Sequence, residues 1–248
     1  MQRKQSPIQH EPIDSALHCS VPEQRRLLGE TPYFKSLTDE QVVEVQKEFQ
    51  QHHYHAEETI HFAGDDATRL SIVGAGSVKL VRSTLDGKDV VIDLLTAGDH
   101  FGSLAVLGDA SYRETALAHT ECCILSTTAP AFANMMQRYP SVAIDSLGMV
   151  ATRLSNAQST IEQLSAHPVE QRVVQMLLHL AGKIGVSSDK GILINIPLSR
   201  QDIADMTGTT VESASRVMSE LRKAGEIESG RRWISILDVE ALRGRLDY

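Results

Sequence analysis

The chain has 248 residues and a mass of 27.2 kDa, with 42% hydrophobic and 23% charged side chains and a net charge of −8. This length suits two ordinary domains with separate cores, and the composition excludes a disordered or collagen-like chain. No apolar run approaches the roughly 18 residues of a membrane span, and the N-terminus is polar, so we expect a cytoplasmic protein with no membrane partner.

The acidity is confined to the first two thirds of the chain. Residues 1–168 carry 13 basic and 21 acidic side chains, whereas residues 169–248 carry 11 of each. A neutral C-terminal part can present one basic face, so the overall charge does not exclude nucleic-acid binding.

The first predicted elements are a flexible arm and two short amphipathic helices. The arm covers residues 1–20, and the helices cover residues 22–30 and 37–50. The second helix opens with Thr38-Asp39-Glu40-Gln41, a capping box in which Thr38 and Gln41 bind each other's backbone amides.

Residues 52–126 have the pattern of an antiparallel β domain. Its short alternating apolar segments are residues 70–73, 78–81, 90–95, 116–118 and 122–125. Glycine–aspartate pairs separate these segments, and Asp86-Gly87 is the clearest hairpin turn. We therefore predict an antiparallel sandwich or barrel.

Two helices follow, over residues 129–138 and 141–166, and the second carries a regular apolar seam. The seam recurs at spacings of three and four residues: Leu147, Val150, Leu154, Ala157, Ile161 and Leu164. This a/d heptad pattern predicts a parallel homodimer, and the alternative is a helix packed on its own domain. His167-Pro168 ends the helix and marks a hinge.

The C-terminal part contains the most informative segment. A helix over residues 169–181, a loop over 182–191 and a strand over 192–196 lead into two helices joined by a tight turn, within residues 198–221. Ser199 with Asp202 predicts a cap for the first helix, Gly208 a permissive turn, and Thr209 with Glu212 a cap for the second. This arrangement is a helix-turn-helix, whose second helix enters the DNA major groove.

The second of these helices has one apolar and one polar side. Its apolar side contains Val211, Ala214, Val217, Met218 and Leu221. Arginine can bind guanine as a bidentate donor, glutamate can accept from cytosine, and serine can pair with several base edges. The candidate DNA contacts are Thr210, Glu212, Ser213, Ser215, Arg216 and Ser219. The alternative role of Glu212 is to cap its own helix.

A hairpin with a basic tip follows this helix. Residues 226–228 and 233–236 form its strands, and Arg231 and Arg232 lie at its tip. The hairpin predicts a wing whose arginines either contact a phosphate or form a solvated turn.

The order of these motifs resembles the CRP/FNR family of transcription regulators over residues 33–246. The pattern of Gly64-Asp65, Gly76, Asp86-Gly87, Gly98-Asp99 and Phe101-Gly102 is similar to the family's sensor roll. Glu212-x-x-Ser215-Arg216 is similar to the recognition helix of the FNR-like branch. The resemblance implies an α+β fold with an N-terminal double-stranded β-helix (a cyclic-nucleotide-binding-like β-roll), a long dimerisation helix and a C-terminal winged helix-turn-helix.

The resemblance also implies function. It implies an arm over residues 1–20, a sensor domain over 21–139, a dimerisation helix over 140–167 and a DNA-binding domain over 168–248. The dimer would read a TTGA-type palindrome in double-stranded DNA, with Arg216 on guanine and with Glu212 and Ser215 selecting neighbouring bases. RNA polymerase is the further partner that the family implies.

The family's cyclic-nucleotide pocket uses a Gly-Glu pair and then Arg followed by Ser or Thr. The corresponding residues here are Gly102, Ser103, Arg113 and Glu114, with Thr115 one residue further on. Arg113 can pair with a phosphate, but Ser103 replaces the glutamate that would hold a ribose hydroxyl, and the Glu114 carboxylate would repel the phosphate. These differences argue against cyclic AMP, although a one-residue slip would bring Thr115 into the phosphate-binding role.

The cysteines argue against an iron–sulfur cluster. Cys19, Cys122 and Cys123 are the three in the chain, and a four-thiolate cluster needs one more. We expect Cys122 and Cys123 to be small buried core residues, and a redox role for Cys19 stays open.

Histidines gather between residues 52 and 61. His53 and His55 share one face if this segment is a strand, so they are candidate ligands for a metal or haem iron. The alternative is a solvated edge strand. The effector therefore stays open between haem or another gas or redox signal, a cyclic nucleotide, and no ligand at all.

The motifs of common enzymes are missing from the sequence. It contains no P-loop, dinucleotide-binding glycine motif, His-Glu-x-x-His, Gly-x-Ser-x-Gly or Cys-x-x-Cys. We therefore expect a regulator and not an enzyme. A module that binds only proteins would carry larger apolar groups on the outer side of the 212–219 helix.

Overall fold

The computed structural model describes residues 19–84, 89–102, 110–230 and 232–246. Its contacts divide the chain into an N-terminal unit that ends at Asn156 and a C-terminal unit from Ala157 onward. The division falls inside the helix α4 (Pro140–Ala166), which the sequence assigned to a separate segment. None of the described helices is both long and apolar enough to cross a membrane. Residues 1–18 of the predicted arm over residues 1–20, and the Asp86-Gly87 turn, lie outside the described residues, whereas Cys19 is buried and Ser20 caps α1.

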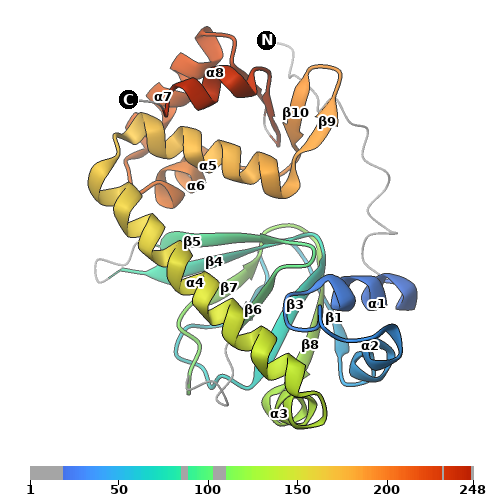
Figure 1. Ribbon diagram of the computed structural model, residues 1–248. Helices are drawn as coiled ribbons and strands as arrows, with labels where there is room; N and C mark the ends of the chain where they lie inside the picture. The colour runs from blue at the N-terminus through green and yellow to red at the C-terminus, as the bar shows by residue number, and fades with distance from the viewer. Residues whose placement is uncertain (1–18, 85–88, 103–109, 231, 247–248) are drawn as a thin grey trace. The chain divides into compact units, whose positions relative to one another are not determined.

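The N-terminal unit contains two four-stranded antiparallel sheets, together with the helices α1 (Val21–Glu30), α2 (Asp39–Gln46) and α3 (Ala129–Arg138) (Figure 1). The first sheet has the order β1 (Gln50–Tyr54), β8 (Cys122–Thr128), β3 (Arg69–Ala75), β6 (His100–Gly102). The second has the order β2 (Thr59–His61), β7 (Thr115–Ala118), β4 (Ser77–Ser83), β5 (Asp89–Thr96). The predicted antiparallel β domain is thus confirmed.

The two faces of the first sheet bury different side chains, because neighbours along a strand point to opposite sides. Leu70, Ile72 and Leu125 pack with side chains of the surrounding helices. Val73 and Ile124, each one residue away from these, pack in a second core between the sheets. We call this second core, which lies between the two sheets, the inner core. A cavity between the sheets therefore has the inner core as one of its walls.

The start of the second helix agrees with the sequence, but its end does not. Gln41 N donates to Thr38 Oγ1 over 3.4 Å, and Thr38 N donates to Gln41 Oε1 over 2.9 Å, which is the predicted capping box. The predicted helix over 37–50 was too long, since α2 ends at Gln46 and Gln50 already pairs with Ser126 in β1. The short strands β2 and β6 were not predicted, and a strand in the region of β1 was left open by the sequence.

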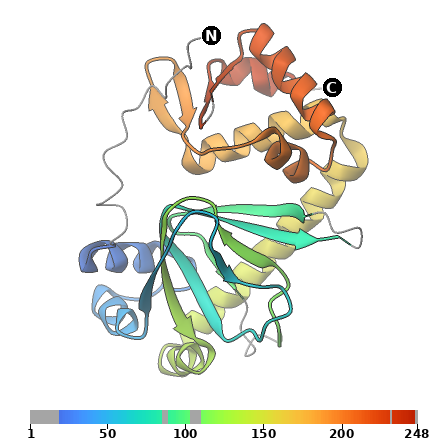
Figure 2. The ribbon, with the colours of Figure 1, turned by 180° about the vertical axis from the view of Figure 1, so that it is seen from behind.

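Helix α4 has a buried side and an exposed apolar side, and Figures 1 and 2 show it as one continuous helix. Val142 and Met149 are buried in the core of the N-terminal unit. By contrast, the seam residues Leu147, Leu154 and Ile161 are 70%, 61% and 64% exposed. Val150 and Leu164 are also exposed, so the described residues do not cover the seam.

Among its described residues, the C-terminal unit contains six elements that were predicted from sequence and two, a strand over 186–188 and a helix over 239–244, that were not. Its helices are α5 (Val169–Ile184), α6 (Arg200–Met206), α7 (Val211–Lys223) and α8 (Val239–Gly244). Its sheet has the order β11 (Ile227–Ser229), β12 (Ile234–Ile236), β10 (Gly191–Ile194), β9 (Val186–Ser188). The predicted loop over 182–191 was wrong in part, because it contains the end of α5 and the whole of β9.

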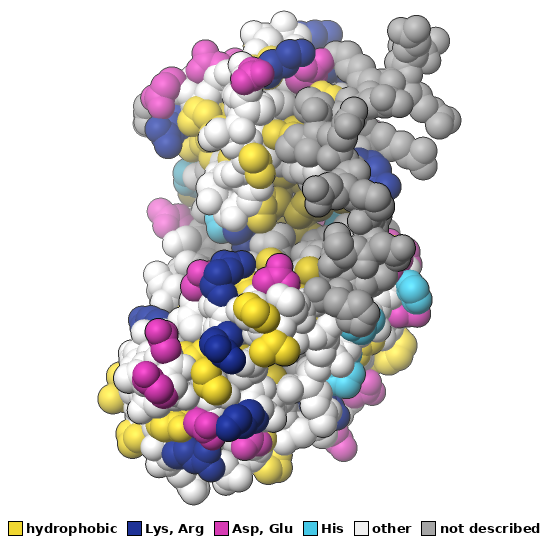
Figure 3. Space-filling model, turned by 90° about the vertical axis from the view of Figure 1, so that its right-hand side faces the viewer, with side chains coloured by type: hydrophobic (Ala, Val, Ile, Leu, Met, Phe, Trp, Pro, Cys, Tyr) yellow, Lys and Arg dark blue, Asp and Glu magenta, His cyan; other side chains and the backbone are white. Residues whose placement is uncertain are grey.

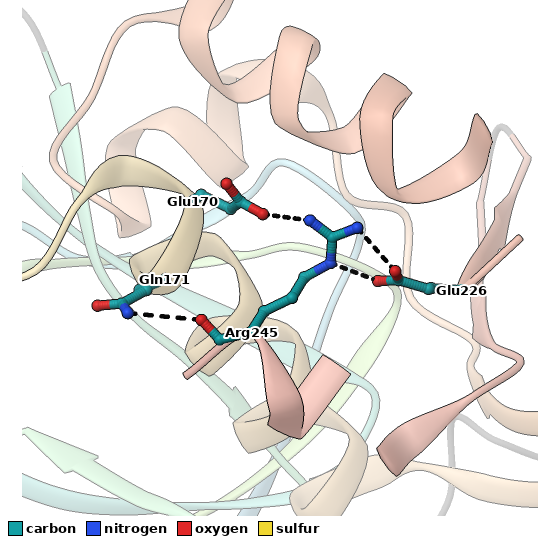
Figure 4. A network of polar contacts seen from close by, with 4 residues as sticks. All are labelled: Glu170, Gln171, Glu226 and Arg245. Carbon is teal, nitrogen blue, oxygen red and sulfur yellow. Dashed lines mark hydrogen bonds and ion pairs between the residues drawn. The ribbon is translucent and has the colours of Figure 1, made fainter. Parts of the chain in front are cut away.

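An ion-pair network connects Arg245, which follows α8, with Glu170 and Glu226 of the same unit (Figure 4). Arg245 donates from Nε and Nη2 to the two carboxylate oxygens of Glu226, both over 2.7 Å, and also pairs with Glu170 of α5. Gln171 Nε2 donates to the backbone oxygen of Arg245 over 3.4 Å. These carboxylates raise the pKa of Arg245 above its usual value, the Glu226 hydrogen bond being the largest cause.

We expect Arg245→Ala to lower the free energy of unfolding of this unit by about 2–4 kcal/mol, because it leaves the largely buried Glu226 carboxylate without its partner. Urea unfolding measures the effect. Arg243→Ala is the matched control, since Arg243 pairs with the exposed Glu240 and its loss should cost less than about 1 kcal/mol. Equal losses in the two variants would contradict this role for the network.

Candidate functional site

The start of α6 and the glycine turn after this helix have the structure that the sequence predicts. Ser199 Oγ accepts from Asp202 N over 3.0 Å, and the Asp202 carboxylate accepts from Ser199 N over 2.8 Å. Gly208 follows with φ +58°, in the left-handed region that favours glycine. A Cβ at Gly208 would also lie only 2.8 Å from Leu164 Cδ2, so the closeness of this side chain is a second reason for a glycine here.

The cap of α7 lies one residue later than predicted. Thr210, not Thr209, is the N-cap, and its Oγ1 accepts from Ser213 N over 3.2 Å. Thr209 N instead donates to the Ala204 oxygen over 2.9 Å and closes the turn. Glu212 therefore is not the capping partner, although its charge in the first turn suits the helix dipole.

Helix α7 turns its apolar side inward. Ala214, Val217, Met218 and Leu221 are buried as predicted, whereas Val211 at the first turn is 38% exposed. The packing of the apolar side therefore fixes the direction in which the polar side of α7 points. Val211 belongs to the predicted apolar side but is the first residue of the helix and is exposed.

The polar side of α7 presents a row of side chains. Glu212, Arg216 and Thr210 are exposed, and Ser213, Ser215 and Ser219 are half-buried. The side chains of Glu212 and Arg216 make no hydrogen bond or ion pair within the described part of the chain. Ser219 Oγ donates to the Ser215 backbone oxygen over 2.7 Å, and Thr210 Oγ1 donates to Ser213 Oγ over 3.1 Å.

The sequence did not predict that two arginines, Arg200 and Arg222, interact in this unit. Burial and the guanidinium of Arg222 hold the pKa of Arg200 below its usual range. Arg200 opens α6 and Arg222 lies in the last turn of α7, so two positive charges from separate helices repel each other. No spacing pattern in the sequence brings these two residues together.

The wing is present as a two-stranded hairpin. Strands β11 and β12 pair in antiparallel register, with Ile227 opposite Ile236. Arg232 at the tip is exposed, and Arg231 lies outside the described residues.

The residues expected to bind an effector have other partners in the N-terminal unit. Arg82 Nη2 donates to Glu114 Oε1 over 3.0 Å, and Thr115 Oγ1 accepts from Ala63 N over 3.0 Å. Gly102 has φ +85°, and a Cβ there would lie 2.6 Å from the Arg69 backbone oxygen. Arg113 is exposed, and Ser103 lies outside the described residues.

A cavity of about 540 Å³ lies in the N-terminal unit, and it is lined by other residues than those expected. Its polar lining includes His52, His61, Arg69 and Asp65, and Ile124 of the inner core forms part of its wall. The remaining lining residues are Tyr54, Thr59, Ile60, Phe62, Asp66, Thr68, Ser71, Tyr112 and Ser126.

The two histidines of this cavity are neutral at physiological pH. Burial lowers the pKa of His61 to about 4, and the ring stacks on Tyr112 with centroids 3.8 Å apart. Burial also lowers the pKa of His52, and the neighbouring Arg69 adds to this effect. His52 Nε2 is buried without a hydrogen-bond partner among the described residues.

The two histidines proposed as metal ligands do not converge. His53 Nε2 contacts the Gln51 amide over 2.9 Å, and His55 Nδ1 lies 3.0 Å from Glu121 Oε2. His55 follows the last residue of β1, so the two do not share a strand face. Histidine side chains gather at one edge of this unit in Figure 3, and no group of three candidate metal ligands occurs among the described residues.

His61 makes the stability of the N-terminal unit depend on pH. Its pKa in the folded protein, about 4, lies below the ordinary 6.5, so the unfolded chain binds the proton more tightly. The contribution of neutral His61 to the free energy of unfolding is fully present above about pH 6.5. It is lost as the pH falls toward 4, and the loss is up to about 3 kcal/mol. We expect His61→Phe to reduce this loss when urea unfolding at pH 7 and pH 4 is compared. His55→Phe, at an exposed histidine, is the control, and an unchanged pH dependence in His61→Phe would contradict the assignment.

Two family profiles match the chain. Residues 51–139 match the cyclic nucleotide-binding domain, and residues 171–245 match the Crp-like helix-turn-helix domain. The first profile covers the strands of the roll together with α3, and the second covers the unit that contains α6, α7 and the wing.

Relatives of known role match over most of their length. The global nitrogen regulator of a Synechocystis species is 31% identical over 186 residues, which are 74% of this chain and 83% of the relative. The cyclic AMP receptor protein of Thermus thermophilus is 27% identical over 212 residues, 86% of this chain and 95% of the relative. Among solved structures, FixK2 from Bradyrhizobium japonicum has a TM-score of 0.73 and 25% identity, and the match covers 81% of this chain and 98% of that one.

Proposed function

The chain belongs to the CRP/FNR family of transcription regulators, and from this premise we propose that it binds DNA as a homodimer through the polar side of α7. Such regulators bind DNA with their helix-turn-helix and act as dimers, and they are not enzymes. The observation that carries the proposal is that Glu212 and Arg216 are exposed and have no side-chain partner among the described residues, on a helix whose opposite side is buried.

We assign base readout to the first half of α7. Arg216 has a free guanidinium fork that fits O6 and N7 of guanine, and Glu212 has a carboxylate that can accept from the cytosine amino group. Ser215 lies next to Arg216 and selects a neighbouring base. The target is a TTGA-type half-site, which the likeness of Glu212, Ser215 and Arg216 to the FNR-like recognition helix suggests.

Thr210, Ser213 and Ser219 have a smaller part in this readout. Their hydroxyl groups cap or brace α7, so their first role is to hold the helix in position. Each still has an acceptor lone pair for a donor such as a water or a base amino group.

Phosphate contacts come from basic side chains around α7. Burial and, after it, the charge of Arg222 lower the pKa of Arg200, and a phosphate oxygen bound near these two arginines would offset both effects. Arg232 at the wing tip is a second contact of this kind. These contacts contribute affinity for any sequence and make binding fall as salt rises.

The homodimer forms along the α4 seam. An uncovered row of large apolar side chains at heptad spacing is typical of a two-stranded coiled coil. Two-fold symmetry of the protein then requires two-fold symmetry of the DNA site, with half-sites about one helical turn apart.

For the signal, we propose a small molecule bound in the cavity lined by His52 and His61. Its volume lies within the usual range for ligand pockets. A haem would find an imidazole ligand in His52, whose buried Nε2 has no hydrogen-bond partner among the described residues, and haem would supply the binding of a diatomic gas. A cyclic nucleotide is disfavoured because Glu114 and Thr115 already bind Arg82 and Ala63.

The effector proposal is tested by adding haem to the purified chain and recording the absorbance spectrum. We expect a bound-haem spectrum in the wild type and its loss or shift in His52→Ala, whereas His53→Ala, at an exposed position on the same strand, should leave it unchanged. Saturable binding of cyclic AMP with no haem spectrum would overturn the proposal.

The DNA-binding proposal is tested by selection from a pool of random duplexes with the full chain. We expect the recovered sequences to share a two-fold symmetric site whose half-sites contain TTGA. Recovery of a non-symmetric site, or of no common sequence under any ligand condition, would contradict it.

A further inference from the structure

Two cysteines that are distant in the sequence meet beside Gly74 of β3. Cys19 directly precedes Ser20, the N-cap of α1, and Cys123 lies in β8. A Cβ on Gly74 would lie 2.6 Å from Cys19 Sγ and 3.3 Å from Cys123 Sγ, so the two sulfurs occupy the space beside this glycine. Both residues are buried, Cys19 at 6% and Cys123 at 0% exposure.

The two thiols also interact chemically. Cys19 donates a hydrogen bond to the Cys123 sulfur, which lowers the pKa of Cys123 below its usual value. The same hydrogen bond raises the pKa of Cys19, because it would be lost if Cys19 gave up its proton. Cys123 is therefore the better thiolate of the pair, and Cys19 is a neighbouring thiol that still carries a proton.

Cys122 differs from its neighbour in both position and chemistry. It points to the opposite side of β8, into the inner core with Val73 and Phe101. Burial raises the pKa of its thiol to about 12, so it reacts poorly as a nucleophile. The chain thus contains its own matched control at the adjacent position.

We propose that Cys19 and Cys123 are a redox pair that hydrogen peroxide oxidises to an intramolecular disulfide between the segment before α1 and strand β8. In the first step the Cys123 thiolate attacks one peroxide oxygen and the O–O bond breaks, which gives a sulfenic acid and a hydroxide ion; the proton that the Cys123 thiol released on ionisation converts this hydroxide to water. The Cys19 sulfur then attacks the sulfenic sulfur, its proton leaves with the departing hydroxide as a second water, and the S–S bond forms. Two thiols and one peroxide therefore give one disulfide and two waters.

The position of Cys19 favours this closure. A disulfide needs its sulfurs about 2.05 Å apart, so the two side chains must approach further. Cys19 precedes the first residue of α1 and lies outside any strand, so its approach breaks no helical or sheet hydrogen bond. Cys123, which is fixed between β1 and β3, need not move.

The test is alkylation of the full chain, before and after a few equivalents of peroxide, with N-ethylmaleimide added in denaturant. Intact mass should show three alkylated thiols in the reduced protein and one after oxidation. Peptide mapping of the oxidised wild type should recover the fragment containing Cys19 joined to that containing Cys123. Because this mapping uses the unmodified chain, it does not depend on the folding of any variant.

Variants separate the pair from the third cysteine. Cys122→Ala should still form the link, and Cys19→Ala should not. Oxidation should also raise the thermal unfolding midpoint of the wild type but not of Cys19→Ala, because the link closes a loop that spans most of the N-terminal unit. A link through Cys122, a link between two chains, or three alkylated thiols after oxidation would overturn the proposal.

Discussion

Replacing Leu154 by Asp is expected to convert the proposed homodimer into a monomer, with a dissociation constant at least about a hundredfold higher. Leu154 lies in the middle of the α4 seam and is 61% exposed in the single chain. Because a symmetric interface contains the residue twice, the substitution places two carboxylates opposite each other in an apolar contact. Burying unpaired charges of the same sign costs several kcal/mol.

Sedimentation velocity of the full chain over a range of concentrations measures this effect. Ser159→Asp is the matched control, since it adds the same charge to an exposed position on the opposite side of α4 and should leave the dimer intact. A Leu154→Asp protein that still sediments as a dimer would rule out the seam as the interface. Circular dichroism at the same time establishes that both variants keep their helix content.

Arg216→Ala is expected to weaken binding to the palindrome by about 1–3 kcal/mol for each half-site and to relax the choice of one base pair in each. The guanidinium of Arg216 is exposed and has no partner among the described residues, so the loss reflects a DNA contact and not a broken contact within the protein. Binding to DNA of unrelated sequence should change much less than binding to the palindrome.

Arg216→Lys sharpens this test, because lysine keeps the positive charge but cannot form the two parallel hydrogen bonds to guanine. We expect Arg216→Lys to keep most of the non-specific affinity and to lose the preference at that base pair. Fluorescence anisotropy with duplexes altered one base pair at a time measures both quantities. An equal loss on all sequences in Arg216→Ala would mean that Arg216 contacts a phosphate and does not read a base.

The sequence predicts the architecture well where the pattern depends on local residues. The seam of α4, the Ser199–Asp202 capping box and the buried side of α7 each follow from spacing within about two helical turns, and all three are present in the structure. The strands β3, β4, β5, β7 and β8 were also predicted from local residues, because each contains a short apolar segment and turns with glycine and aspartate separate most of these segments.

The sequence fails where tertiary pairing decides. Helix α2 stops at Gln46 because the residues after it are recruited into β1, which no helical pattern reveals. The α7 cap moves from Thr209 to Thr210 because Thr209 N already binds the Ala204 oxygen in the turn. Both errors are of one or a few residues at an element's end, where local preferences compete with a distant partner.

The sensor part was harder to anticipate than the DNA-binding part. Sequence reasoning chose His53 and His55, yet the cavity is lined by His52 and His61, because β1 exposes one side and turns the other inward. The meeting of Cys19 with Cys123 is likewise invisible along the chain, since 103 residues separate them and Gly74 supplies the space. Such sites arise from the packing of elements distant in the sequence.

The central claim is that a pair of α7 helices reads a two-fold symmetric DNA site. The most direct test is the affinity of the full chain for a TTGA-bearing palindrome and for a scrambled duplex, at about 0.15 M salt. We expect the palindrome to bind at least about a thousandfold more tightly in one ligand or redox state. Equal affinities for the two duplexes in every state, with haem, with cyclic AMP, reduced and oxidised, would contradict the account.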